Sequence, residues 1–153
     1  MKFNKVKNMS GSRGFTLIEL MVTIAVIAIL AMIAAPSMSN LIAKQQLNKT
    51  TRDLAETLTL ARSQAALLRQ EVTVTLNNTT ANTAKNFYWS PTTGNTLNAP
   101  TPIPPLVFMA NGTLKNTVSD TYFVICNSTA KKTKTITLTR MGSVSLGAEG
   151  TCT

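Results

Sequence analysis

The chain has 153 residues and a formal net charge of +9, and it contains no histidine. Without an imidazole, the sequence offers no Ser–His or Cys–His pair and no ordinary imidazole base. Its two cysteines are too few for a typical structural zinc site. The acidic residues are scattered, and no Gly-rich phosphate loop is present. We therefore predict a protein that is not an enzyme and that uses no cofactor and no metal.

The first 36 residues combine a basic segment with a long apolar run. Residues 1–14 hold four basic side chains and no acidic one, and residues 15–35 hold a single ionisable side chain, Glu19. As a helix, the apolar run would span roughly 31 Å, near the thickness of a bilayer's hydrocarbon core. The basic flank predicts a cytoplasmic N-terminus. The helix-length apolar run, which continues without a cleavage boundary, predicts a transmembrane segment that stays in the mature protein. A cleavable secretory signal ending near residues 31–35 is the alternative.

Glu19 is the anomaly of this apolar run. A carboxylate at mid-depth in a bilayer costs at least about 2.5–3.5 kcal/mol, and less near an interface that the side chain can reach. One interpretation is an interfacial acid of no consequence. The other is an acid that finds a positive partner after leaving lipid, such as the free α-amine of another chain.

Residues 14–20, with the sequence GFTLIEL, resemble the class III signal of type IV pilins and type II secretion pseudopilins. The resemblance implies cleavage between Gly14 and Phe15 by a prepilin peptidase, and N-methylation of Phe15. It also implies that Glu19 pairs with the N-terminal amine of a neighbouring subunit during assembly. Pro36 matches the position where such helices bend, because its missing N–H and its ring disrupt the helical hydrogen bonds.

The helix is predicted to continue through residues 37–70 as an amphipathic segment. Apolar residues recur at steps of seven, four, three, four and three, and so mark one face that should pack on a sheet: Leu47, Leu54, Leu58, Ala61, Ala65 and Leu68. The opposite face carries two pairs with i, i+4 spacing, Lys49 with Asp53 and Arg52 with Glu56.

Residues 71–153 are predicted to form a β-rich globular domain. Strict alternation over residues 72–76 predicts a half-buried strand, and the polar residues 77–86 predict a loop. Further strands are predicted at residues 87–89, 106–109, 122–126, 135–140 and 144–146. Four prolines within residues 98–105 predict a stiff extended connector, with a partner-recognition site as the alternative. One long helix followed by short strands indicates an α+β fold with antiparallel sheet.

A second motif narrows the family. The ARSQA sequence of residues 61–65, followed by the VTV sequence of residues 72–74, resembles the helix-end and first-strand signature of the GspH/FimT/FimU group of minor pilins and pseudopilins. That resemblance implies a helix packed on two small antiparallel sheets. The predicted domains are a leader (1–14), a transmembrane and assembly half of the helix (15–36), its amphipathic half (37–70) and the globular domain (71–153).

Cys126 and Cys152 are the only cysteines. In a chain exported past an inner membrane, an oxidising compartment favours a disulfide between them, which would tie the C-terminal tail to the strand at residues 122–126. Closing a loop of about 27 residues should contribute on the order of 3 kcal/mol. A free redox pair is the alternative, although the wide spacing and the absence of a C-x-x-C motif argue against it.

A basic cluster raises the question of DNA binding. Four basic side chains lie near one predicted turn and strand: Lys131, Lys132, Lys134 and Arg140. Exposed Tyr88 or Trp89 would stack on bases, and phosphate contacts would be salt-sensitive. Some FimT-like minor pilins are DNA receptors, but arginines in their C-terminal tail carry much of the binding, and no basic residue follows Arg140 here. We expect a solvated lysine-rich hairpin, with residues 87–89 partly in the core.

The resemblances imply a minor pilin of a type IV pilus, placed at the tip or in the priming complex and supporting assembly of a fibre used in motility, adhesion or DNA uptake. A type II secretion pseudopilin of the GspH type is the alternative, and a DNA-binding minor pilin is the second. Expected partners are a prepilin peptidase, other minor and major pilins, the inner-membrane assembly machinery, and lipid before assembly. The expected location is a single pass of the inner membrane with a periplasmic globular domain, then the fibre or pseudopilus.

Overall fold

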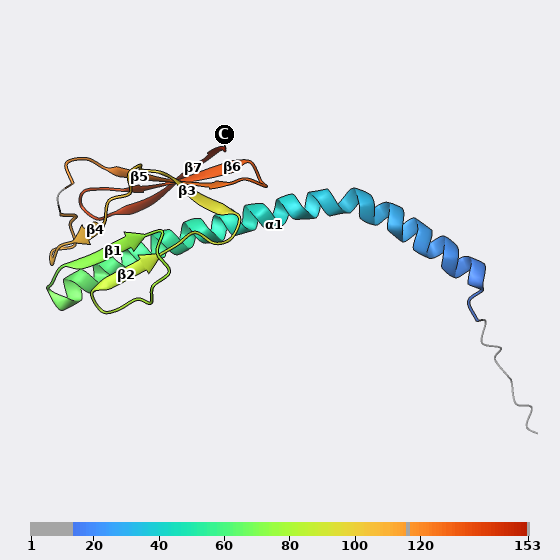
Figure 1. Cartoon of the computed structure of the whole chain (residues 1–153), viewed down its shortest axis with the longest axis horizontal. Helices are drawn as coiled ribbons and strands as arrows, with labels where there is room; N and C mark the ends of the chain where they lie inside the picture. Colours follow the sequence, from blue (N-terminus) through green and yellow to red (C-terminus); the bar gives the residue numbers. More distant parts are fainter. Residues whose placement is uncertain (1–13, 116, 153) are drawn as a thin grey trace, which may run out of the picture. The chain divides into compact units, whose positions relative to one another are not determined.

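The computed structural model describes residues 14–115 and 117–152, shown in Figure 1. Within them, one helix precedes seven strands: α1 (Leu17–Leu68), β1 (Val72–Leu76), β2 (Asn86–Trp89), β3 (Asn95–Ala99), β4 (Leu106–Phe108), β5 (Thr121–Asn127), β6 (Lys132–Leu138) and β7 (Val144–Thr151). The chain divides into two compact units, Met1–Ser37 and Met38–Thr153. The α+β fold class predicted from the sequence is confirmed.

The first unit, from residue 14 onward, is the apolar beginning of α1. Its large apolar side chains from Phe15 to Ile33 are each at least 50% exposed, so this unit has no core of its own. By length and composition, no single helix of the described residues is apolar enough over its length to cross a membrane, whereas the segments Leu17–Ile33 and Ser37–Leu68 qualify as a pair. Pro36 lies between these segments, and the bend expected there stays a prediction.

The second unit contains two sheets, as predicted. One has the strand order β2-β1-β4 and the other has the order β3-β5-β6-β7. All pairings are antiparallel except that β2 runs parallel to β1, which corrects the expectation of purely antiparallel sheet. The polar loop after β1 is long enough to return the chain to the start of that strand, so no tight hairpin forms. Thr73 N–H donates to the Lys85 carbonyl at 2.9 Å and fixes this return.

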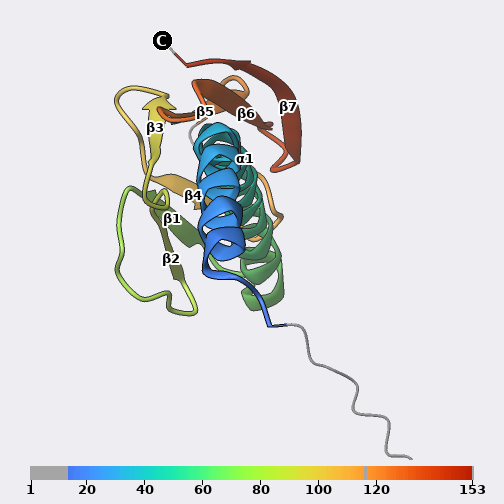
Figure 2. The ribbon, with the colours of Figure 1, turned by 90° about the vertical axis from the view of Figure 1, so that its right-hand side faces the viewer.

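The core lies between the second half of α1 and both sheets, and Figure 2 shows strands on two sides of the helix. Five of the six predicted helix positions are buried: Leu47, Leu54, Leu58, Ala61 and Ala65. Leu68 is 37% exposed, so its predicted place on the sheet is wrong. It is the last residue of α1, whereas Ala65, three residues earlier, is fully buried.

The strand predictions were best where side chains alternate. The first strand has the predicted bounds, whereas β6 begins earlier than predicted, at Lys132, and β7 extends to Thr151. Backbone pairing on both sides of Lys132, with Asn127 and with Thr151, extends the ladder into this polar stretch. The strand β3, which consists mostly of polar residues, was not predicted. The four prolines of residues 98–105 lie between β3 and β4, as expected for a connector.

Candidate assembly site and the disulfide-tied sheet

The predicted processing junction lies just before the start of α1. Gly14 precedes the helix, and a Cβ added to it would meet no atom within 4 Å among the described residues beyond its chain neighbours. Phe15 is 78% exposed. Among the described residues, nothing covers the junction that a peptidase would approach. Cleavage between Gly14 and Phe15 stays a prediction.

Thr16 caps α1, and this feature was missed at the sequence level. Its Oγ1 accepts a hydrogen bond from the Glu19 backbone N–H at 3.3 Å. A threonine followed three residues later by glutamate is the capping-box pattern, which the TLIE sequence displays openly. Glu19 thus lies in the first turn of the helix, where the helix dipole favours a negative charge. Glu19 therefore helps to begin the helix, in addition to the assembly role predicted for its carboxylate.

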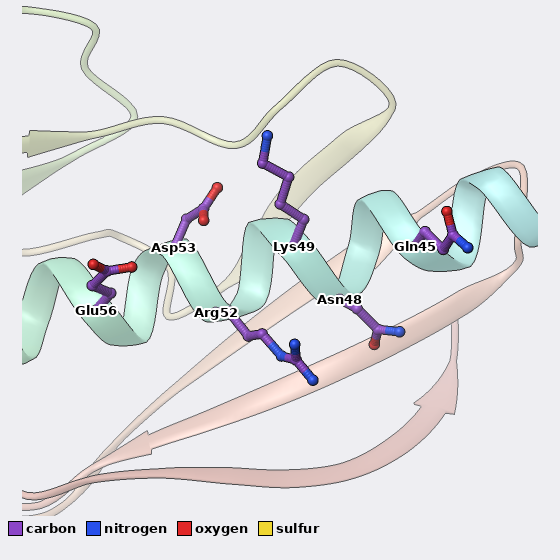
Figure 3. Close-up of a pocket in the computed structure, with 6 residues that line it drawn as sticks. All are labelled: Gln45, Asn48, Lys49, Arg52, Asp53 and Glu56. Carbon is purple, nitrogen blue, oxygen red and sulfur yellow. The ribbon is translucent and has the colours of Figure 1, made fainter.

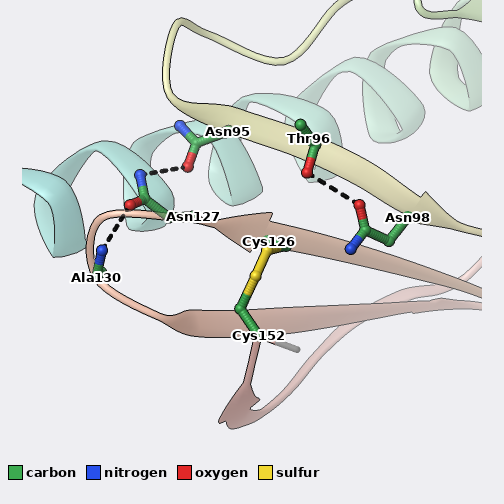
Figure 4. Close-up of a disulfide and its surroundings, with 7 residues drawn as sticks. All are labelled: Asn95, Thr96, Asn98, Cys126, Asn127, Ala130 and Cys152. Carbon is green, nitrogen blue, oxygen red and sulfur yellow. Dashed lines mark hydrogen bonds between the residues drawn. A yellow bond between two sulfur atoms is a disulfide. The ribbon is translucent and has the colours of Figure 1, made fainter.

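The structure contains the predicted disulfide, drawn in Figure 4. It joins Cys126 in β5 to Cys152, which directly follows β7, with a Cα–Cα distance of 5.6 Å. Beside it, the Cys152 N–H donates to the Lys131 carbonyl at 3.2 Å. The tail is therefore tied to the four-stranded sheet by one covalent bond and one hydrogen bond.

A buried polar network lies next to the disulfide and was not predicted. Asn95 donates from Nδ2 to Thr50 Oγ1 at 2.9 Å and to Thr92 Oγ1 at 3.0 Å. Asn127 donates from Nδ2 to Asn95 Oδ1 at 2.9 Å and accepts from the Ala130 N–H at 2.9 Å, as Figure 4 shows. These bonds join α1, β3 and the turn after β5, and they satisfy polar groups that burial would otherwise penalise.

The candidate DNA-contact residues do not form one patch. Lys131 lies in the turn before β6, and Lys132 and Lys134 lie on β6, on the same side of the strand as the buried Ile136. Arg140 follows the other end of β6, and that strand is roughly 20 Å long. The three lysines are therefore neighbours, but the arginine is separated from them.

The aromatic residues considered for base stacking are only partly available. Trp89 is 6% exposed and belongs to the core cluster, and Tyr88 is half-buried in β2. Phe87 also packs against that cluster. The expectation that residues 87–89 lie partly in the core is confirmed, which removes Trp89 as a stacking platform.

A groove of about 450 Å³ runs along α1, and Figure 3 draws six of the side chains that line it. Its lining residues all belong to the helix: Gln45, Asn48, Lys49, Arg52, Asp53 and Glu56. Among the described residues, the only ion pair within 4 Å joins Lys115 to Glu71 at 2.6 Å. The two i, i+4 pairs noted in the sequence, Lys49 with Asp53 and Arg52 with Glu56, therefore form no ion pair within 4 Å.

Comparisons with known proteins agree with this architecture. Residues 9–35 match the prokaryotic N-terminal methylation motif, and residues 50–142 match the type II transport protein GspH. The type IV major alpha-pilin of Moraxella bovis is 49% identical over 47 residues, which cover 31% of this chain and 30% of that relative. Fimbrial protein EcpB of Eikenella corrodens is 49% identical over 51 residues, which cover 33% and 32%. No solved structure matches.

The similarities cover different shares of the proteins compared. The similarity to the curated relatives spans only about a third of their length, whereas the GspH match covers more than half of the present chain. The methylation motif implies processing by a prepilin peptidase and a pilin or pseudopilin assembly context, and such families are structural rather than catalytic. The chain belongs to the GspH family and is a type IV pilin-like protein.

Proposed function

We propose that this chain is a minor pilin of a type IV pilus, incorporated at the tip or in the priming complex, where it supports assembly of the fibre. The observation that carries the proposal is the division of α1. Its first part exposes its apolar side chains, while its second part is buried against two small sheets. The first part is suited to lipid or to a bundle of like helices, and the globular part is suited to choosing neighbours.

Processing would create the charge that assembly needs. Cleavage after Gly14 places a new α-amine on Phe15, four residues before Glu19. In lipid, the Glu19 carboxylate is costly. In a bundle, the amine of a neighbouring chain neutralises it, so the carboxylate favours the assembled state over the membrane pool. The partners are thus a prepilin peptidase, other minor and major pilins, and the inner-membrane machinery that moves them.

The location follows from the same segment. The basic leader would keep the N-terminus in the cytoplasm, the apolar part of α1 would make one pass of the inner membrane, and the globular unit would fold in the periplasm. A disulfide between Cys126 and Cys152 suits such an oxidising compartment. No catalytic step is assigned to the globular unit.

The proposal is tested in a piliated host that expresses the full chain with a C-terminal tag. We expect a mass decrease equal to the leader, one added methyl group on Phe15, and the tag in sheared fibres. A Gly14→Val variant is the control, because a branched side chain at the junction should block cleavage. The minor-pilin role would be refuted if the unaltered chain retained its leader. It would also be refuted if the tagged chain were absent from the sheared fibres.

A second candidate function is a pseudopilin of a type II secretion system, and the match of residues 50–142 to the type II transport protein GspH favours it. Deletion of the gene separates the two candidates. Loss of surface fibres with normal secretion supports the pilus, whereas loss of secreted enzymes with normal fibres supports the secretion system.

A further inference from the structure

Three segments of the globular unit meet where the chain enters it, and they are here called the entry end: residues 38–50, 92–95 and 127–134. A Cβ added to Gly94 would lie 3.7 Å from Gln46 Oε1 and 3.8 Å from Asn127 Nδ2. The Asn127 side chain also accepts a hydrogen bond from the Ala130 N–H, as Figure 4 shows. The turn between β5 and β6 is therefore held near Gln46, which follows Met38 by about two helical turns.

The entry end is basic. Its charged side chains are all lysines: Lys44, Lys49, Lys131, Lys132 and Lys134. Two acids lie beside it, since Glu149 of β7 is in register with Lys134 and Asp53 follows Lys49 by one helical turn. Neither acid forms an ion pair within 4 Å in the described part of the chain. The positive charge of the entry end is therefore largely uncompensated.

A polar hollow of about 260 Å³ opens at the entry end. It is lined by Gln46, Lys49, Thr92 and Thr93. An ammonium group, an amide N–H and two hydroxyls are the donors that phosphate oxygens accept from. The hollow differs in this respect from the larger groove on α1, whose lining includes Asp53 and Glu56.

The chain itself keeps the entry end near the apolar segment. Residues 20–43 hold no ionisable side chain, so Lys44 is the first charge after Glu19. Leu41 and Ile42 are still roughly half exposed, and burial begins with Ala43 among the described residues. The helical residues 36–44 span roughly 13 Å. Lys44 therefore lies within that distance of the end of the apolar run, in whichever direction the globular unit is turned.

We propose that the entry end lies against the anionic phospholipid headgroups of the bilayer that holds the apolar segment. Acidic lipids attract lysines near a membrane surface, and the aliphatic lysine stems lie along the apolar boundary while the amines reach phosphate. The hollow at Lys49 takes one headgroup phosphate. DNA would be attracted by the same charges, but only a bilayer is brought to them by the chain itself. The inference rests on the membrane location given in the proposed function, and it concerns the membrane pool before assembly.

The test measures how fast each lysine amine reacts when the full chain is in a bilayer. The processed chain is purified in detergent and inserted into two kinds of nanodisc, one of phosphatidylcholine alone and one that also contains phosphatidylglycerol. An uncharged succinimidyl ester acylates the amines, and mass spectrometry gives the rate at each lysine. We expect the entry-end lysines to react about threefold more slowly in the discs with phosphatidylglycerol, and the difference to disappear at high salt.

Two lysines of the same chain serve as internal references. Lys115 pairs with Glu71, and the Lys85 carbonyl accepts from the Thr73 N–H, so both lie beside the segment that follows the last residue of α1. This segment is at the opposite end of the buried part of the helix from Gln46. Lys85 and Lys115 should react at equal rates in the two kinds of disc.

Substitutions make the test specific. K131Q/K132Q/K134Q should bring the rates of Lys44 and Lys49 in the two discs to within about 1.5-fold of each other, because most of the attracting charge is gone. R69Q/K85Q/K115Q removes the same number of charges outside the entry end and should leave the threefold difference unchanged. Retention of the Cys126–Cys152 disulfide, scored by thiol labelling, shows that each variant has folded.

The proposal would be overturned by equal acylation rates of the entry-end lysines in the two discs, or by an equal slowing of Lys85 and Lys115. Duplex DNA added to the phosphatidylcholine discs provides a third result. Protection by DNA, with none by phosphatidylglycerol, would assign these lysines to nucleic acid and overturn the lipid contact.

Failure of the proposed function is scored separately. A chain that shows the lipid protection but never enters sheared fibres would refute the minor-pilin role alone. A chain that does not enter nanodiscs would refute the membrane location, and this contact with it.

Discussion

Arg62 donates a hydrogen bond from Nε to the carbonyl oxygen of Gly112 at 3.1 Å, across 50 residues of sequence. Gly112 and Gly142 each adopt a φ of +78° in turns with the same hydrogen bonds. Gly112 N–H donates to the Met109 carbonyl, and Gly142 N–H donates to the Thr139 carbonyl, both at 2.8 Å. Arg62 therefore joins the helix to the turn after β4, and Gly142 brings the turn after β6 against the same place.

The two glycines should differ in their tolerance of a methyl group. A Cβ on Gly142 would collide with the Gly112 carbonyl oxygen, which is backbone, and would meet Arg62 Nε at 2.9 Å. A Cβ on Gly112 would meet only the Arg62 side chain, at 3.1 Å from Nε. We expect Gly112→Ala to lower the free energy of unfolding by about 1–2 kcal/mol for its positive φ, and Gly142→Ala to lower it by at least about 1 kcal/mol more.

Urea unfolding of the full chain in detergent provides the measurement, because the single tryptophan, Trp89, is 6% exposed and its fluorescence reports the core. Equal losses for the two alanine variants would contradict the close packing of the two turns.

The sequence predicted those parts of the fold in which burial follows a local period. The buried face of α1 from Leu47 to Ala65 and the alternating burial in β1 both arise from contact with one core. The periodicity of apolar residues was therefore sufficient to predict both elements. The parallel course of β2 depends on one loop, in which Asn82 Oδ1 accepts from the Tyr88 N–H at 2.7 Å. A single hydrogen bond of this kind leaves no periodic pattern in the sequence, so the parallel course of β2 could not be predicted.

The candidate site was predictable to a similar degree. The pairing of Cys126 with Cys152 followed from their being the only two cysteines. The capping role of Thr16 was visible in the TLIE sequence and was overlooked. The contact of Arg62 with Gly112 was not visible, because the ARSQA sequence carries no mark of a partner 50 residues away. Long-range contacts of single side chains require the folded structure.

The buried network around Asn127 should be sensitive to loss of one amide. Asn127→Ala leaves Asn95 Oδ1 without its donor and the Ala130 N–H without its acceptor. An unsatisfied buried group costs about 1–3 kcal/mol, and the Ala130 N–H is only part-buried, so we expect the free energy of unfolding to fall by about 2–4 kcal/mol. Asn98→Ala is the matched control, because the exposed Asn98 side chain only accepts from Thr96, and a change within about 0.5 kcal/mol is expected. A small loss for Asn127→Ala in urea unfolding would refute the structural role of the network.

The disulfide should stabilise the globular unit through the loop that it closes. Cys126 and Cys152 are separated by 26 residues, and we expect Cys126→Ser/Cys152→Ser to lower the free energy of unfolding by about 3 kcal/mol. Dithiothreitol should cause a similar loss in the unaltered chain and none in the double variant, both read by Trp89 fluorescence. An equal response of the two proteins to the reductant would show that the effect arises elsewhere.

The two roles of Glu19 can be separated by a pair of substitutions. Glu19→Gln removes the charge but keeps a side chain that suits a capping box, whereas Glu19→Ala removes both. We expect a prepilin peptidase to process both variants, because Glu19 lies outside the cleaved Gly14–Phe15 bond. If the carboxylate neutralises the α-amine of a neighbouring chain, both variants should enter sheared fibres at least tenfold less than the unaltered chain, measured by immunoblotting against the membrane pool. Normal incorporation of Glu19→Gln alone would assign the residue to helix capping and remove the assembly role of its charge.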